Sequence, residues 1–129
     1  MEKKYTIFII LLTVVLLGAI VGFAQYKVAS QPDFTPLAMC LKEKGATFYG
    51  AFWCPHCQAT KALFGKGKDA LPYVECSTPD GQGQLPICTE RGVKSYPTWI
   101  FADGSVLTGQ QSLEVLADKT NCSITQAQS

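Results

Sequence analysis

The feature that most limits how this chain can fold is a stretch without a single charged side chain, from Tyr5 to Tyr26. Most of its residues are Ile, Leu, Val, Phe or Ala, and a helix of roughly 20 such residues is long enough to cross the hydrocarbon core of a membrane. We therefore expect residues 1–24 to form a signal anchor or transmembrane segment. Only the remainder of the 129-residue chain is then available for a folded domain.

The charges in front of this stretch set its expected orientation. Lys3 and Lys4 outweigh Glu2, and this positive end favours a cytoplasmic N-terminus with the rest of the chain on the extracytoplasmic side, periplasmic or extracellular. A cleaved signal peptide is the alternative, because Gly22-Phe23-Ala24 offers small residues at the spacing of a cleavage site. The length of the stretch favours the anchor, and both interpretations export the domain.

Charge balance excludes one class of partner. Beyond the first four residues, basic and acidic side chains are equal in number, and no basic cluster stands out. A domain with no net charge offers nothing that would attract a phosphate backbone, so we expect no nucleic-acid partner.

Hydrophobic patterning and turn residues predict the element order α-β-α-β-α-β-β-α after a linker over residues 25–34. Thr35 is the expected N-cap of the first helix with Pro36 at its first position, and Met39 and Leu41 are its expected core residues. The expected elements that follow are a strand over 46–53, a helix over 55–64, a strand over 71–76, a loop over 77–84, a short helix over 85–91, a hairpin of 98–102 and 106–108, and a helix over 112–120.

These elements define an α/β domain over residues 35–122, followed by a polar tail over 123–129. The strand over 46–53 is almost continuously apolar, which is typical of a central strand that is buried on both faces. The strand over 71–76 should run parallel to it after a right-handed helical crossover. Asp103-Gly104 is a strong hairpin signal, so the last two strands should be antiparallel. We expect a four-stranded mixed sheet flanked by helices.

The pair Cys54 and Cys57 lies at the junction between the central strand and the next helix, with Pro55 and His56 between them. At the start of a helix, free N–H groups and the helix dipole stabilise negative charge, and so favour the thiolate that is the reactive form of cysteine. A protonated His56 would add positive charge beside Cys54. A stabilised thiolate favours the reduced pair, which makes the corresponding disulfide a stronger oxidant.

Other interpretations of the cysteines are less favoured. Zinc needs four ligands, and Cys76 and Cys88 are too far apart to supply a second Cys-x-x-Cys. Haem attachment needs His after the second cysteine, where Gln58 stands. A purely structural Cys54–Cys57 bridge would close a loop of only a few residues, and so would stabilise the folded state little. We expect a redox pair with no metal and no organic cofactor. Six cysteines allow 15 pairings, and the residues alone do not choose among them.

These motifs resemble the thioredoxin superfamily. The resemblance rests on the Cys-Pro-His-Cys segment after an aromatic strand and on Tyr96-Pro97-Thr98 at the start of a later strand; the Cys-Pro-His-Cys form resembles disulfide oxidases of the DsbA type. The segments "YGAFWCPHCQ", "YVECS", "PICTERGVKSYPTWIF" and "LEVLAD" are similar to the thioredoxin-like domain that is fused to bacterial vitamin K epoxide reductase homologues. The resemblance covers roughly residues 36–120 and implies a thioredoxin-like fold.

The resemblance implies roles for particular residues. Cys54 should be the exposed nucleophile and Cys57 the residue that resolves the mixed disulfide, with His56 beside them. Pro97 should be a cis proline that faces the pair, and Phe52, Trp53, Tyr96 and Pro97 should form an apolar rim for an extended client. Trp99 is expected in the sheet.

The resemblance also implies a Cys76–Cys88 disulfide, with a second redox pair that relays electrons as the alternative. Cys40 and Cys122 are left to pair by elimination, which would tie the two ends of the domain together. Many thioredoxins carry a buried acid on the strand before the active pair, and this chain has none there. The proton of Cys57 must then move through water, His56 or another group; Glu75 lies on the neighbouring strand.

The expected function is that of a membrane-tethered thiol–disulfide oxidoreductase. It would form disulfides in exported proteins and exchange electrons with a membrane partner of the vitamin K epoxide reductase type. The alternatives are a disulfide reductase or isomerase that is fed by a membrane donor, and a non-enzymatic module that binds a client or copper.

Overall fold

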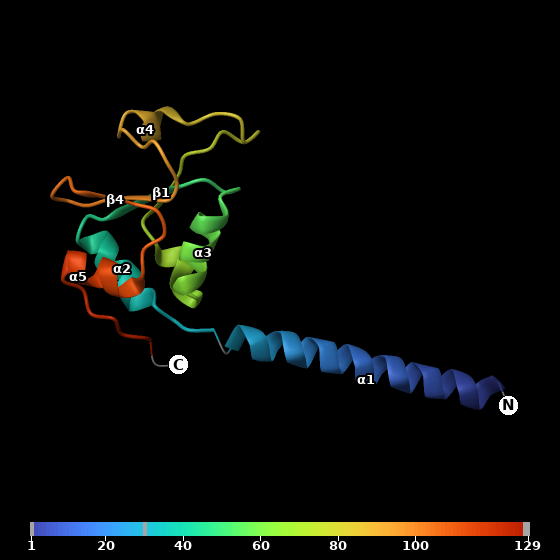
Figure 1. Cartoon of the computed structure of the whole chain (residues 1–129). Helices are drawn as coiled ribbons and strands as arrows, with labels where there is room; N and C mark the ends of the chain where they lie inside the picture. Colours follow the sequence, from blue (N-terminus) through green and yellow to red (C-terminus); the bar gives the residue numbers. More distant parts are fainter. Residues whose placement is uncertain (1, 30, 128–129) are drawn as a thin grey trace. The chain divides into compact units, whose positions relative to one another are not determined.

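The computed structural model describes residues 2–29 and 31–127, and the chain divides into two compact units at residues 31 and 32. The first unit is a single helix, α1 (Glu2–Ala29), drawn in blue in Figure 1. By length and composition, its segment Lys3–Lys27 can cross a membrane. The helix runs past residue 24 because no glycine or proline interrupts residues 25–29.

The second unit contains the expected four-stranded mixed sheet flanked by helices, the α/β arrangement of a thioredoxin-like fold. Its strand order is β2-β1-β3-β4, with β1 and β2 parallel and the other two pairs antiparallel. The elements are α2 (Thr35–Glu43), β1 (Thr47–Gly50), α3 (Pro55–Leu63), the 3₁₀ helix η1 (Lys66–Ala70), β2 (Tyr73–Glu75), α4 (Pro86–Thr89), β3 (Thr98–Ile100), β4 (Val106–Thr108) and α5 (Leu113–Thr120).

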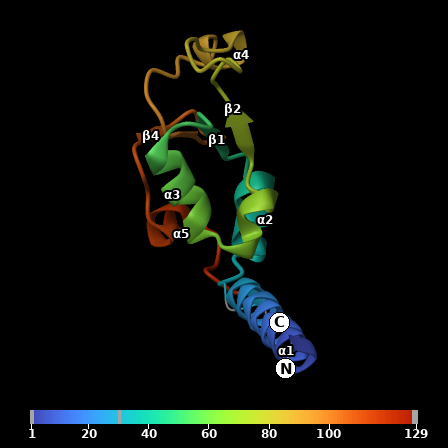
Figure 2. The ribbon, with the colours of Figure 1, turned by 90° about the vertical axis from the view of Figure 1, so that its right-hand side faces the viewer.

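Both faces of the sheet are covered, as the apolar central strand predicted. Successive side chains of a strand point to opposite faces. Phe48 stacks on Trp99 at 4.7 Å between ring centroids, within the larger core that α2, α3 and α5 close. Tyr49 points the other way, into a smaller cluster with the Cys76–Cys88 segment. Figures 1 and 2 show α2, α3 and α5 on one side of the sheet and α4 on the other.

The start of α2 differs from the prediction. Phe34 is the N-cap and Thr35 is the first helical residue, because the carboxylate of Asp33 accepts hydrogen bonds from both the backbone N–H and the hydroxyl of Thr35. Leu41 is buried as expected, but Met39 is 51% exposed, so its assignment to the core is wrong. Residues two apart on a helix point in different directions, so the two side chains do not share the buried face.

The central strand ends earlier than predicted. After Gly50 the backbone turns toward α3, and the N–H of Cys54 donates to the carbonyl of Ala51 at 3.0 Å. The N–H of Phe52 donates to the carboxylate of Glu75 rather than to a neighbouring strand. The short helix α4 is likewise confined to four residues. This early turn places the two active-pair cysteines beyond the C-terminal end of β1, at the start of α3.

Two disulfides are present, in the expected pairing. Cys40–Cys122 joins α2 to the residue after the C-cap of α5, across a sequence separation of 82. Cys76–Cys88 joins the end of β2 to α4, across a separation of 12. Cys54 and Cys57 are free thiols.

Candidate active site

The sulfur of Cys54 lies at the beginning of a helix. Cys54 is the N-cap of α3 in an extended conformation, and its Sγ accepts a hydrogen bond from the N–H of Cys57 at 3.4 Å. Pro55 occupies the first turn, where a proline costs no helical hydrogen bond. A backbone N–H of the first turn therefore points at Cys54, the arrangement that stabilises a negative charge on sulfur.

Only one cysteine of the pair reaches the surface. Cys54 is 4% exposed and Cys57 is 0% exposed, so Cys54 is less open than the exposed nucleophile that we expected. The difference arises because the residue is the start of a packed helix and lies beside the carbonyl of Tyr96. Cys54 is buried, but of the two cysteines it alone keeps exposed surface, so it is the one that an incoming sulfur would meet first.

Cys57 is in a site that disfavours its ionised form. Burial raises the pKa of the Cys57 thiol to about 12, and the neighbouring Cys54 side chain adds to the rise. A backbone hydrogen bond from Ala51 and the charge of Lys61 act in the opposite direction. Cys57 therefore remains a neutral thiol at rest and needs help from its surroundings when it reacts.

The Tyr96–Pro97 peptide bond is cis, as the resemblance implied, and it faces the pair. The thiol of Cys54 donates to the carbonyl of Tyr96 at an S···O distance of 3.8 Å, and Pro97 is fully buried beneath it. A strand of backbone thus lies beside the reactive sulfur, in a position where it can pair with an extended chain.

Two large aromatic side chains stand exposed beside the pair. Phe52 is 49% exposed and Trp53 is 52% exposed. The indole N–H of Trp53 donates to the hydroxyl of Ser77 at 2.8 Å, and its ring lies edge-on to Tyr96 at 6.0 Å between centroids. We call Phe52, Trp53 and Tyr96 the aromatic rim.

His56 is exposed and lies between the two cysteines in sequence. Its backbone carbonyl accepts a hydrogen bond from the Thr60 hydroxyl, and no hydrogen bond of the imidazole to a cysteine is found within the described residues. The contribution of His56 to the pair stays a prediction, and it would act through charge at close range rather than through a fixed hydrogen bond.

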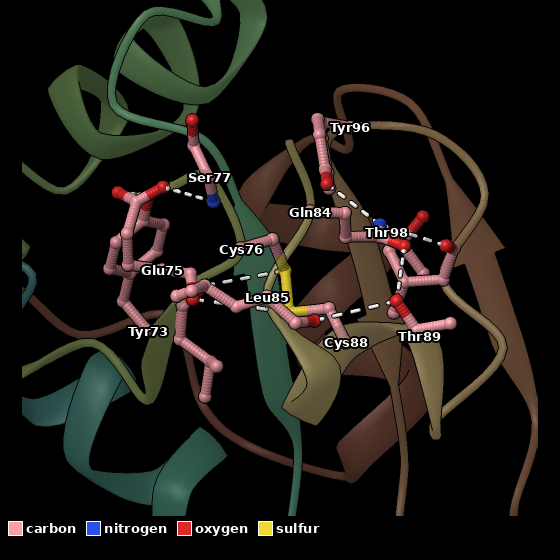
Figure 3. Close-up of a disulfide and its surroundings, with 12 residues drawn as sticks. Tyr73, Glu75, Cys76, Ser77, Gln84, Leu85, Cys88, Thr89, Tyr96 and Thr98 are labelled. Atoms are coloured by element: carbon pink, nitrogen blue, oxygen red, sulfur yellow. Dashed lines mark hydrogen bonds between the residues drawn. A yellow bond between two sulfur atoms is a disulfide. The ribbon is translucent and has the colours of Figure 1, made fainter. Parts of the chain in front are cut away.

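The sequence did not show what holds the rim in place. The carboxylate of Glu75 accepts from the N–H of both Phe52 and Ser77. The side chain of Gln84 donates to the hydroxyl of Tyr96 at 2.7 Å, and Figure 3 shows this bond and the one between Ser77 and Glu75. A side chain added at Gly81 would contact both Phe52 and Trp53, so the 77–84 loop lies against the rim. The alternation of "YVECS" could have placed Tyr73 and Glu75 on one face, but nothing in the pattern pointed to Gln84.

The Cys76–Cys88 disulfide lies beneath this loop (Figure 3). Both residues are 0% exposed, so a thiolate from solvent can reach the bond only if the segment between them opens. This burial favours the structural role over the relay. Within residues 2–29 and 31–127, no group of three or more His, Cys, Asp or Glu side chains could hold a metal ion.

In a mixed sheet of this kind, a dithiol at the start of the helix after a central strand, beside a cis proline that precedes the neighbouring strand, defines the thioredoxin-like class. No family model matches the chain. Over 104 residues it is 41% identical to a thiol-disulfide oxidoreductase of Arabidopsis thaliana, an alignment that takes in 77% of this chain and 27% of the relative. The chain thus spans little more than a quarter of that protein's length. The similarity supports an oxidoreductase of the thioredoxin-like superfamily.

Proposed function

We propose that this chain is a membrane-tethered thiol–disulfide oxidoreductase that forms disulfides in exported proteins. The observation that carries the proposal is the placement of Cys54: its sulfur receives a backbone N–H of α3, lies beside the Tyr96 carbonyl, and has Cys57 buried behind it. This arrangement fits a disulfide that is exchanged with other thiols better than one that only stabilises the fold.

The oxidising reaction has two steps. A client thiolate attacks Sγ of Cys54 in the Cys54–Cys57 disulfide; the new bond joins client and Cys54, and Cys57 leaves as a thiolate that takes up a proton. A second client thiolate then attacks the client sulfur of this mixed disulfide, the client disulfide forms, and Cys54 leaves as a thiolate. The client is oxidised by two electrons, and the Cys54–Cys57 pair is reduced to the dithiol.

Reoxidation uses the same two cysteines in the reverse order. The Cys54 thiolate attacks a disulfide of the membrane partner, and Cys57 then attacks Cys54 to release the partner as a dithiol. We propose a partner of the vitamin K epoxide reductase type, which the sequence resemblance supports. The aromatic rim would receive both client and partner, because each must present an extended segment to Cys54.

Features of both units support the proposed tethering and location. Helix α1 is long and apolar enough to hold the domain at a membrane, and Lys3 and Lys4 favour a domain outside the cytoplasm. Two disulfides in one small domain fit an oxidising compartment, since cytosolic thiols are kept reduced.

The equilibrium potential of the Cys54–Cys57 pair tests the direction of the reaction. We expect the pair, equilibrated with glutathione buffers and quantified by thiol labelling, to be more oxidising than about −200 mV, since the backbone N–H of Cys57 points at Sγ of Cys54 and so favours the reduced pair. A value near the roughly −270 mV of thioredoxin would reject the oxidase and leave the reductase. The Cys54→Ser variant is the control, because it has no pair to titrate.

A further inference from the structure

Cys57 presents a problem that the proposed function does not solve. In either direction of exchange it must carry negative charge, as the group that leaves Cys54 or as the group that attacks it. Its surroundings are apolar and it has no exposed surface. The inference that follows rests on the proposed function and concerns what makes this charge tolerable.

Two residues of the surrounding elements approach Cys57. Gly50 of β1 has no side chain, and a Cβ built there would lie 2.9 Å from the sulfur of Cys57 and 2.8 Å from the ring of Tyr73. The sulfur and the ring therefore meet over this glycine. Lys61 follows Cys57 by four residues on α3, a spacing that puts both on one face of the helix.

Lys61 is held over the ring of Tyr73. Its ammonium nitrogen lies 3.4 Å from the ring centroid, within the range of a cation–π contact. The hydroxyl of Tyr73 donates to the carboxylate of Glu75 at 2.8 Å, and the ring packs edge-on against Phe48. Tyr73 is thus held at its hydroxyl and at its ring, and it gives the Lys61 ammonium a fixed surface to lie on.

We propose that Lys61 is the electrostatic partner of Cys57, that its ammonium on the Tyr73 ring stabilises the Cys57 thiolate during disulfide exchange, and that Tyr73 and Glu75 act as positioning residues for it. The strand before the active pair carries no buried acid that could assist Cys57, and we propose that Lys61 assists it instead. It brings a cation rather than a proton acceptor to the buried sulfur.

The other titratable groups around Cys57 agree with this assignment. Cys54 raises the pKa of the Cys57 thiol, and Lys61 lowers it. Burial, followed by the hydrogen bond to Glu75, holds the pKa of Tyr73 well above its usual range, so the ring stays neutral. Glu75 reaches the site through Tyr73. Neither Gly50 at the end of β1 nor Ala51 after it carries a titratable side chain, and the backbone of Ala51 makes a hydrogen bond to Cys57. Lys61 is the cation among these groups.

The resolving step can be followed by itself. The reduced chain reacts with 5,5′-dithiobis(2-nitrobenzoate) at Cys54, which forms a mixed disulfide and releases one coloured thiolate. Cys57 then loses its proton to solvent and attacks Cys54; the Cys54–Cys57 disulfide forms and a second coloured thiolate leaves. The rate of the second phase as a function of pH reports the ionisation of Cys57.

We expect Lys61→Met to slow the second phase about tenfold near neutral pH and to move its pH profile upward, because removal of a cation disfavours the thiolate. The first phase should change less than about twofold. Lys61→Arg keeps the positive charge and the contact with the ring, so its second phase should be nearly as fast as that of the unaltered chain. Lys68→Met removes an exposed lysine of η1 and should leave both phases unchanged. Lys61→Gln serves as a second uncharged variant if the methionine variant does not fold.

The outcomes distinguish failure of the Lys61 role from failure of the proposed function. If the unaltered chain releases both thiolates and Lys61→Met and Lys61→Gln match it in rate and pH profile, the role of Lys61 is wrong and the proposed function stands. If Lys61→Arg is as slow as Lys61→Met, the lysine acts through packing and not through charge, which also overturns the inference. If the unaltered chain releases no second thiolate, the proposed function itself fails.

Discussion

Replacing Cys54 with serine should reduce oxidative refolding of a client to the uncatalysed rate, a loss on the order of 100-fold or more. The backbone N–H of Cys57 that points at Sγ cannot rescue the reaction, since a serine hydroxyl stays protonated where a thiol would ionise. The assay follows recovery of client activity with the full chain in detergent and a glutathione redox buffer.

Cys57→Ser is the informative companion variant. Without Cys57 the chain cannot form the active disulfide, but the Cys54 thiolate can still attack a disulfide of an oxidised client or of the membrane partner. Because no second thiol is present to resolve the product, we expect mixed disulfides to accumulate and turnover to be lost. Thermal unfolding of Cys54→Ser should stay close to that of the reduced chain, whereas Cys57→Ser places a hydroxyl in an apolar site and should lower the unfolding temperature somewhat. Full activity in Cys54→Ser would place the chemistry elsewhere and remove the basis of the proposed function.

Loss of the Cys40–Cys122 disulfide should lower the free energy of unfolding by about 4 kcal/mol in the chain-entropy model. The bridge closes nearly the whole domain, with a sequence separation of 82, so the unfolded chain gains much freedom when it is cut. Urea unfolding of Cys40→Ala/Cys122→Ala in detergent, followed by tryptophan fluorescence, measures the change.

A single variant provides the matched control for this bridge. Cys122→Ala alone should cost as much as the double variant, because either change removes the same cross-link and the two effects do not add. Exchange activity should persist at temperatures where the variant remains folded, since neither residue belongs to the active pair. A change below about 1 kcal/mol would mean that the helices hold the ends together without the cross-link.

The sheet and the position of the active pair could be predicted from the sequence because they depend on local signals. The apolar run before Cys54, the proline at the start of α3 and Asp103-Gly104 each define a local conformation, and the parallel and antiparallel pairings follow from the connections. Trp99 is buried in the sheet, as expected from its place in a strand.

The surroundings of the pair could not be predicted, because they depend on contacts between distant residues. The sequence places the acid Glu75 on the strand next to the active pair. It does not indicate the hydrogen bond from Phe52, which forms because the chain turns after Gly50. Lys61 and Tyr73 meet across two elements, and nothing in the sequence pattern indicates that contact. Met39 was assigned to the core from its apolarity, which does not say on which side of α2 it lies.

Trapping the mixed disulfide tests the central claim most directly. The full-length Cys57→Ala chain is expressed in cells, free thiols are blocked, and the adducts are isolated and mapped by mass spectrometry. We expect exported proteins to be joined to this chain through Cys54 and through no other cysteine. Adducts at Cys76 or Cys88, or no adduct in cells where the chain is abundant and folded, would contradict it.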